Sequence, residues 1–348
     1  MKYNFGKREK MAKKNKTEKF RSKIGGQALI EGIMMRGIGK SAMACRLPDG
    51  TIDVETWENK NGKNAPWYTK VPFLRGSINM IISLADGYKC LTKSMEKQGD
   101  EYVGESETKF EKWLEEKLGD KLMPVLTVIS GILGVALTLV LFLWLPSFIS
   151  EFLRPIISGI PYETLKQATE SGTPVDMPSY VTPVMVTIEG IIKMIIFVLY
   201  LYITSKMSDM RTMYKYHGAE HKTIACYEAG EELTVENVKK HPRFHKRCGT
   251  SFIVLTLIVS IIAGSFIKYD NVIQRMGYRI LLLPVIVGVS YELIKIAGRH
   301  DNIITAIISA PGLWLQRITT NEPDEKQIEC AIEALKPCIP DNKEDDKW

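Results

Sequence analysis

The sequence predicts an α-helical membrane protein with about four transmembrane helices, a small N-terminal β-rich unit and amphipathic helices. Four apolar runs approach the length that a helix needs to cross a bilayer. Near the N-terminus, apolar and polar residues alternate as in strands, and elsewhere apolar residues recur at helical intervals. The chain has 348 residues and a hydrophobic content of 45%, concentrated in the four runs.

The first 23 residues contain ten lysines and arginines and no apolar core of a signal peptide. We expect residues 1–23 to form a basic, disordered tail. Such a tail sets topology or tethers a protein to anionic headgroups, and contact with RNA is the alternative use.

Residues 24–121 are expected to form a cytoplasmic unit of strands and amphipathic helices. The segment 24–70 supplies its β-rich part, because residues 41–57 alternate in polarity around a Pro-Asp-Gly turn. From Pro72 the apolar residues follow helical spacing, which predicts a helix that lies on the membrane or packs on the β-rich unit. The charged segment 96–121 then leads into the membrane as a helix or linker.

Residues 122–297 are expected to form the membrane domain. Its loop 206–249 carries nine lysines and arginines, whereas residues 146–180 carry two. Cationic flanks resist translocation, so this loop and both termini are predicted to be cytoplasmic, in a multi-pass protein of the cytoplasmic (inner) membrane. The predicted spans are 122–145, 181–204, 250–267 and 280–297.

All six cysteines fall on the predicted cytoplasmic side, which favours free thiols over disulfides. Residues 298–348 follow the last span. There, Pro311 and Gly312 interrupt an apolar segment, which indicates a re-entrant or interfacial piece. A C-terminal amphipathic helix is expected after it, with Asn321 in a capping position and Asp324 three residues on.

The loop 206–249 contains the pattern HxxEH, formed by His217, Glu220 and His221. On a helix, histidines four residues apart point from the same face and can share one ion. The glutamate between them is placed to activate water as a general base, as in the inverzincin peptidases, which use this pattern with a further acidic ligand. We therefore predict Glu220 as the catalytic residue.

Two further residues of the same loop, His245 and Cys248, suit Zn²⁺, whose tetrahedral shell takes nitrogen and sulfur ligands. We expect His217, His221 and Cys248 to be ligands. His245 is expected to be the fourth ligand or to contact the ligands without binding the ion itself. Three ligands indicate a catalytic centre and four a structural one, and both remain open. The alternatives are contact with lipid phosphates and ordinary structural roles, the latter being expected for His241.

Carboxylates inside apolar runs are costly unless they are paired or face protein. Glu292 lies in the fourth run, where it either supplies the acidic ligand or, as the favoured alternative, pairs with Lys295. Glu189 and Lys193 are predicted to form an ion pair within one helix.

A glycine-rich segment, GGQALIEGIMMRG, begins at Gly25. Its glycines permit tight turns or close backbone approach, and Gln27, Glu31 and Arg36 are polar residues among apolar ones. The segment is predicted to be structural or, alternatively, to line a site shared with the loop 206–249.

With GGQALIEGIMMRG, HGAEHK, HKRCGTSF and YELIKIAGR, the chain resembles the YqhQ family of bacterial membrane proteins over nearly its whole length after Ile24. The resemblance implies a metal-dependent enzyme of unknown activity. It extends to Gln27, Glu31 and Arg36, to the HxxEH residues, and to His245, Arg247, Cys248 and Thr250. The family usually has proline where this chain has Lys246.

The leading functional hypothesis is a hydrolase at the membrane surface that acts on a peptide or a lipid-linked molecule. The first alternative is a non-enzymatic factor for membrane-protein biogenesis, whose basic surface meets the translocon or the ribosome. The second is a small transporter built on the intramembrane charges, which would need to be a homo-oligomer to form a pathway. The lipid bilayer is the expected partner in every case.

Overall fold

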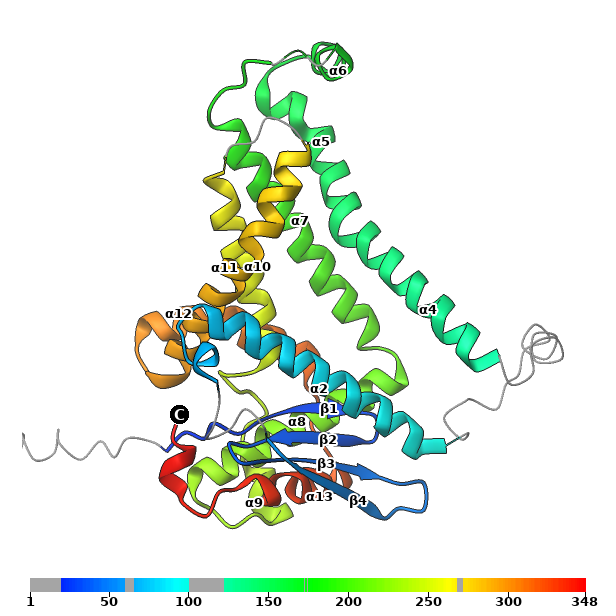
Figure 1. The fold of residues 1–348 in the computed structure, drawn as a ribbon, viewed down its shortest axis with the longest axis vertical. Coiled ribbons are helices and arrows are strands. Elements are labelled where there is room, and N and C mark those ends of the chain that lie inside the picture. The colour runs from blue at the N-terminus through cyan, green and yellow to red at the C-terminus, as the bar shows by residue number, and fades with distance from the viewer. Residues whose placement is uncertain (1–19, 60–65, 100–121, 172, 174, 268–271) are drawn as a thin grey trace, which may run out of the picture.

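The computed structural model describes residues 20–59, 66–99, 122–171, 173, 175–267 and 272–348 (Figure 1). Most of the predicted basic tail and of the charged segment 96–121 lies outside these residues. The described chain has a helical part that contains the apolar segments and, at one end of it, a unit of strands and helices.

A four-stranded antiparallel sheet, in the order β1-β2-β3-β4, forms the N-terminal unit. Strands β3 and β4 correspond to the alternating segments that the sequence indicates, whereas β1 and β2 form a hairpin from the glycine-rich segment. Glu31 has φ 46° in the turn of this hairpin. The strands are Gly25–Leu29, Gly32–Arg36, Lys40–Arg46 and Ile52–Glu58.

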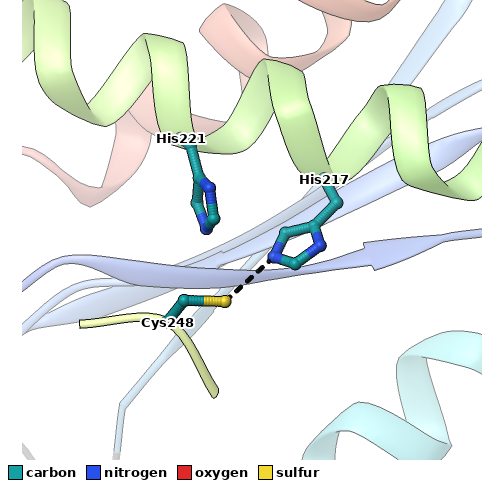
Figure 2. Close-up of side chains that lie close together, drawn as sticks. All are labelled: His217, His221 and Cys248. Carbon is teal, nitrogen blue, oxygen red and sulfur yellow. Dashed lines mark hydrogen bonds between the residues drawn. The ribbon is translucent and has the colours of Figure 1, made fainter. Parts of the chain in front are cut away.

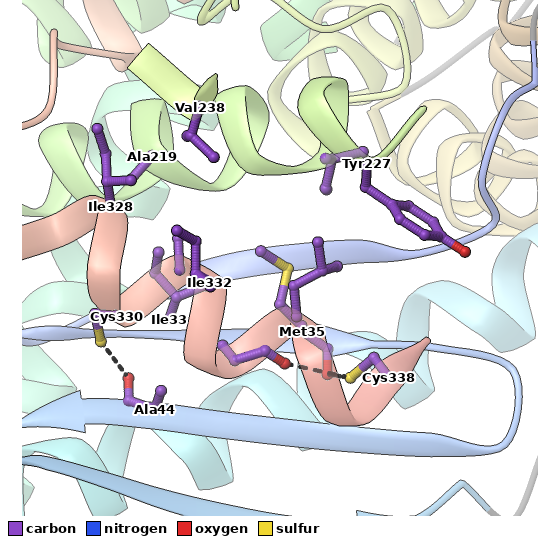
Figure 3. Packing of buried hydrophobic residues seen from close by; sticks show 14 of the residues in the cluster. Ile33, Met35, Ala44, Ala219, Tyr227, Val238, Ile328, Cys330, Ile332 and Cys338 are labelled. Carbon is purple, nitrogen blue, oxygen red and sulfur yellow. Dashed lines mark hydrogen bonds between the residues drawn. The ribbon is translucent and has the colours of Figure 1, made fainter. Parts of the chain in front are cut away.

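Both faces of the sheet are buried, because successive side chains of a strand point to opposite faces. Ile33 and Met35 pack under helices α8 (Ser208–Ala229) and α13 (Glu325–Leu335), whereas Met34 packs with Cys90 of helix α2 (Leu74–Gln98). Figure 3 shows the first of these cores, in which the thiols of Cys330 and Cys338 donate to strand carbonyls at 3.1 and 3.3 Å. All six cysteines are free, as predicted.

Helix α2 joins the sheet to the apolar helices, because it contacts strands on one side and α11 (Val272–Arg299) on the other. Gly76 lies so close to Tyr291 of α11 that an added Cβ would come within 2.7 Å of the tyrosine side chain. Arg75 of α2 forms a bidentate ion pair with Glu292, with Nε 2.7 Å from Oε1. Glu292 is therefore paired, but with Arg75 and not with the expected Lys295.

Among the described residues, three helices are long and apolar enough to cross a membrane: Ile129–Ser158, Val181–Thr204 and Gly277–Arg299. The first begins inside α4 (Leu122–Leu139) and continues through a π-helical turn (Val140–Trp144) and α5 (Leu145–Ser158). The second is α7, and the third belongs to α11. The expected span 250–267 forms α10 (Gly249–Ser265), a shorter apolar helix of 17 residues that contacts α7 and α11.

The predicted pair within α7 is present, with Lys193 Nζ 2.7 Å from Glu189 Oε1. Arg279 of α11 also binds Glu189, at 2.9 Å to both carboxylate oxygens. The buried carboxylate thus holds two helices together, an arrangement that satisfies a charge in an apolar surrounding.

The sequence indicated an interruption at Pro311 and Gly312 in the segment after α11, but the structure has none there. The segment is one helix, α12 (Ile303–Thr319), with Pro311 inside it. An added Cβ at Gly312 would come within 2.3 Å of Ser251, so the glycine allows α12 to lie close against α10. Asp324, and not Asn321, is the N-cap of α13, where it forms a capping box with Gln327.

The remaining helices of the described chain are short. They are α6 (Tyr162–Ser171) and α9 (Val235–Lys240), with 3₁₀ turns at Trp67–Thr69, Lys336–Cys338 and Lys343–Asp346. Near the termini, Ser22 Oγ donates to Asp346 at 2.6 Å, so the two ends of the described chain meet.

Replacing Gly218 by alanine is expected to destabilise the protein by about 1–3 kcal/mol. The new Cβ would lie 2.0 Å from the carbonyl oxygen of Asn321, so backbone must shift, and this outweighs alanine's higher helix propensity. The measurement is the thermal unfolding midpoint of the detergent-solubilised protein. Gly134→Ala is the matched helical control, because nothing lies within 4 Å of its Cβ position. Equal midpoints for Gly218→Ala and the parent would contradict the expectation.

Candidate metal centre

Helix α8 brings His217 and His221 together, as their spacing of four residues predicts. Their ring centroids are 4.4 Å apart, and both rings point from α8 toward the segment that precedes α10 (Figure 2). His221 is almost completely buried.

Cys248 completes the group from the opposite side. It is the N-cap of α10, and its Sγ lies 3.2 Å from His217 Nε2 and 3.1 Å from Thr250 Oγ1. One ligand atom from each of His217, His221 and Cys248 lies within 4.8 Å of the other two. The structure thus assembles three of the four predicted metal ligands.

Backbone carbonyls fix the orientation of both imidazoles. His217 Nδ1 lies 2.8 Å from the carbonyl oxygen of Thr319, and His221 Nδ1 lies 2.6 Å from that of Arg243. A carbonyl can only accept, so each Nδ1 is the donor, and each Nε2 remains as the nitrogen available to a ligand. This is how histidines that bind metals are usually held.

Close contact between Cys248 and His217 shifts the pKa of both groups. Burial alone would raise the pKa of the Cys248 thiol, but the charges and hydrogen bonds of His217 and His221 hold that pKa well below its usual value. Burial would lower the pKa of His217, and interaction with Cys248 instead raises it to about 9. The lowered pKa of the thiol favours the thiolate, which is the form of cysteine that binds metals.

Glu220 lies beside this group in a buried position. Burial raises the pKa of its carboxyl group, against the attraction of His217 and His221 and a backbone hydrogen bond from Gly26. Its Oε2 is buried without a hydrogen-bond partner among the described residues. Buried polar atoms are normally satisfied, so an unpartnered carboxylate oxygen here fits a site that receives a water, a cation or a substrate.

His245 is near the group but is held differently. Its ring centroid is 5.5 Å from that of His221, and its Nε2 lies 3.1 Å from Nη2 of Arg247, a group that can only donate. Burial and the charge of Arg247 hold the pKa of His245 well below its usual value, so its Nε2 lone pair is used by the arginine. Arg247 also forms an ion pair with Glu228.

The remaining predicted residues do not reach the three ligands. Arg36 pairs with Asp86, Glu31 accepts from the hydroxyl of Tyr216 at 3.0 Å, and Gln27 packs against Gly87 of α2. Glu292 is engaged by Arg75. The glycine-rich segment approaches the site through its backbone, because an added Cβ at Gly26 would lie 3.0 Å from Glu220 Cδ.

Several supporting groups escaped sequence reasoning. The carbonyls of Thr319 and Arg243 carry no signal in a sequence. Gln316 is recognisable in the sequence, because it is a side-chain amide within an apolar helix. Its side chain donates to the carbonyl of His245 and accepts from the backbone amide of His245, both at 2.8 Å. It also donates to Ser251 Oγ at 3.0 Å, which links α12 to α10.

A second group of possible ligands lies at the end of α8. One ligand atom from each of Cys226, Glu231 and His241 lies within 4.8 Å of the other two. His241, for which an ordinary structural role was expected, therefore belongs to a second possible ligand group. His241 Nε2 is 3.3 Å from a carboxylate oxygen of Glu231, which is exposed.

A family model described as "Protein of unknown function (DUF1385)" matches residues 71–341. The chain is also 33% identical over 316 residues to the uncharacterized protein YqhQ of Bacillus subtilis (strain 168), an alignment that covers 90% of this chain and 92% of that protein. No solved structure matches it. These findings confirm the resemblance that the motifs indicate, and the chain belongs to the DUF1385 family.

Proposed function

We propose that the protein is a hydrolase of the cytoplasmic membrane surface, with Zn²⁺ held by His217, His221 and Cys248. The observation that carries the proposal is the convergence of three nitrogen and sulfur ligand atoms within 4.8 Å beside a buried carboxylate oxygen that no described residue binds. In this proposal α10 is a fourth, shorter span, and both termini are cytoplasmic.

The donor set fits zinc. Two imidazoles and a thiolate are borderline-soft ligands, typical of Zn²⁺ sites. His245 also lies near this group, but its Nε2 accepts from Arg247. A three-ligand site leaves a coordination position open, which favours a catalytic over a structural centre.

The residues of the chain have distinct parts in this mechanism. A bound Zn²⁺ would supply Lewis-acid chemistry, lowering the pKa of a water molecule and polarising the group to be cleaved. Glu220 takes a proton at its unpartnered Oε2, because burial already raises the pKa of its carboxyl group toward the range of a general base. Gly26 keeps that carboxylate in place, and Thr319 and Arg243 hold the imidazoles.

Helix α2 supports a location at the membrane surface. The side of α2 away from the sheet exposes apolar side chains at helical spacing, namely Ile81, Leu84, Tyr88 and Met95. An amphipathic helix with such a face lies in the interface of a bilayer. The same face would hold an apolar segment of another protein, and this observation favours the alternative function as a factor in membrane-protein biogenesis.

The transporter alternative rests on a cavity of about 200 Å³ between α7, α10 and α11, lined by Glu189, Lys193 and Arg279. These charges bind one another. Mutual pairing explains them as a structural link, so this alternative ranks below the other two.

The first prediction of this proposed function concerns metal content. Protein purified in detergent without chelators should contain zinc, and His217→Ala and Cys248→Ala should each lose about one equivalent, because two remaining ligands hold Zn²⁺ weakly. Elemental analysis by mass spectrometry measures this. His300→Ala, which changes an exposed histidine outside both groups, is the control. Cys226→Ser shows whether the second group holds metal. A parent that binds no zinc even after reconstitution would refute the centre.

The second prediction separates catalysis from structure. Glu220→Gln should keep its zinc and its unfolding midpoint but lose hydrolysis by at least about 100-fold, the usual contribution of a general base. The assay incubates the protein in liposomes with a peptide library and a membrane lipid extract, and mass spectrometry detects products that have gained water. Products formed equally by Glu220→Gln would exclude the assigned role. Their absence with the zinc-loaded parent would favour the biogenesis alternative.

A further inference from the structure

A basic cavity lies at the end of α7, apart from the three metal ligands. Its volume is about 290 Å³, and it is formed where α7, α8 and the end of α12 meet. Four cations line it: Lys206 after α7, Arg211 and Lys215 on α8, and Arg317 in the last turn of α12.

The charge in this cavity is poorly compensated. Within the described chain, Lys215 has a carboxylate partner, Asp324, at 3.5 Å, and no acidic side chain lines the cavity. Arg211 and Lys215 are four residues apart on one helix face, a spacing at which like charges repel. Four cations around one cavity therefore favour binding of an anion that bridges them.

The position of the cavity identifies the kind of anion. Helix α7 ends at Thr204, so Lys206 lies two residues beyond a helix of spanning length and composition. Exposed Tyr202, which also lines the cavity, has Lys206 Nζ 4.5 Å above its ring. Tyrosines and cations at the end of a span mark the headgroup level of a bilayer. Basic pockets there bind phosphate-bearing headgroups.

We propose that this cavity binds the phosphate group of an anionic phospholipid headgroup, with Arg211 and Arg317 as its main ligands. A guanidinium can donate two parallel hydrogen bonds to phosphate oxygens, so these two side chains, from α8 and α12, clamp the group from two helices. Lys206 and Lys215 add charge. Asn321 closes the cavity, held by its side-chain bond to the carbonyl of Arg211 at 3.3 Å.

The experiment uses the full chain in a non-ionic detergent. Native mass spectrometry counts bound lipid, and the thermal unfolding midpoint is followed while phosphatidylglycerol, phosphatidylcholine or inorganic phosphate is added in separate arms. Phosphatidylglycerol should bind and raise the midpoint, and the other two should not. In Arg211→Gln/Arg317→Gln its affinity should fall about thirty-fold, since each cation near an anionic lipid contributes roughly a factor of five.

Arg154→Gln/Lys166→Gln is the matched control, because it removes the same charge from α5 and α6, at the other end of α7. It should bind phosphatidylglycerol as the parent does. If the cavity variant does not fold, Lys206→Gln replaces it, with an expected loss of about five-fold.

Three outcomes would overturn the proposal. They are equal binding of phosphatidylglycerol by the cavity variant and the parent, equal binding of phosphatidylcholine and phosphatidylglycerol, and stabilisation by inorganic phosphate in place of the lipid. Zinc content should be the same in all variants, so this result does not depend on the metal centre.

Discussion

The hydrogen bonds from His217 and His221 to two backbone carbonyls are the constraint on which the candidate site depends. One carbonyl belongs to Thr319 at the end of α12, and the other to Arg243 in the segment before α10. Neither acceptor can be supplied by α8 itself. The imidazoles therefore take their orientation only when α8, which packs on the sheet, lies against the end of α12 and the segment before α10. Folding of the strand-containing unit and its attachment to the helical part are thus linked through the same two side chains.

Close backbone approach makes this docking geometrically possible. Gly218 lets Asn321 lie against α8, Gly312 lets α12 lie against α10, and Gly26 lets strand β1 approach Glu220. In each case a Cβ would meet atoms at 3.0 Å or less. Gln316 then fixes the segment before Cys248, through two hydrogen bonds to the backbone of His245. The glycines thus allow the short distances between these elements, and the buried side chain of Gln316 fixes the position of the segment that leads to Cys248.

The sequence predicts what depends on local periodicity. Spacing alone places His217 and His221 on one helix face, and apolar length predicts spans at 122–145, 181–204 and 280–297, which overlap the helices Ile129–Ser158, Val181–Thr204 and Gly277–Arg299. It fails where distant segments decide. The partner of Glu292 is Arg75, which lies more than 200 residues earlier, and no local pattern reports it. Pro311 indicates a break in the helix, but α12 is continuous because it packs against α10. The contact of Gly312 with α10 joins segments far apart in the sequence, so no local pattern reports it.

The position of Cys248 distinguishes it from the other cysteines. The thiols of Cys45, Cys330 and Cys338 are buried in the core, and burial raises the pKa of each to about 12, so these groups remain protonated. Cys248 is also buried, but it is the N-cap of α10 and faces two imidazoles. A helix N-terminus stabilises negative charge, and so do the charges and hydrogen bonds of neighbouring histidines. The fold thus lowers the pKa of this thiol, toward the form that binds a metal, at the point where the apolar helix α10 begins.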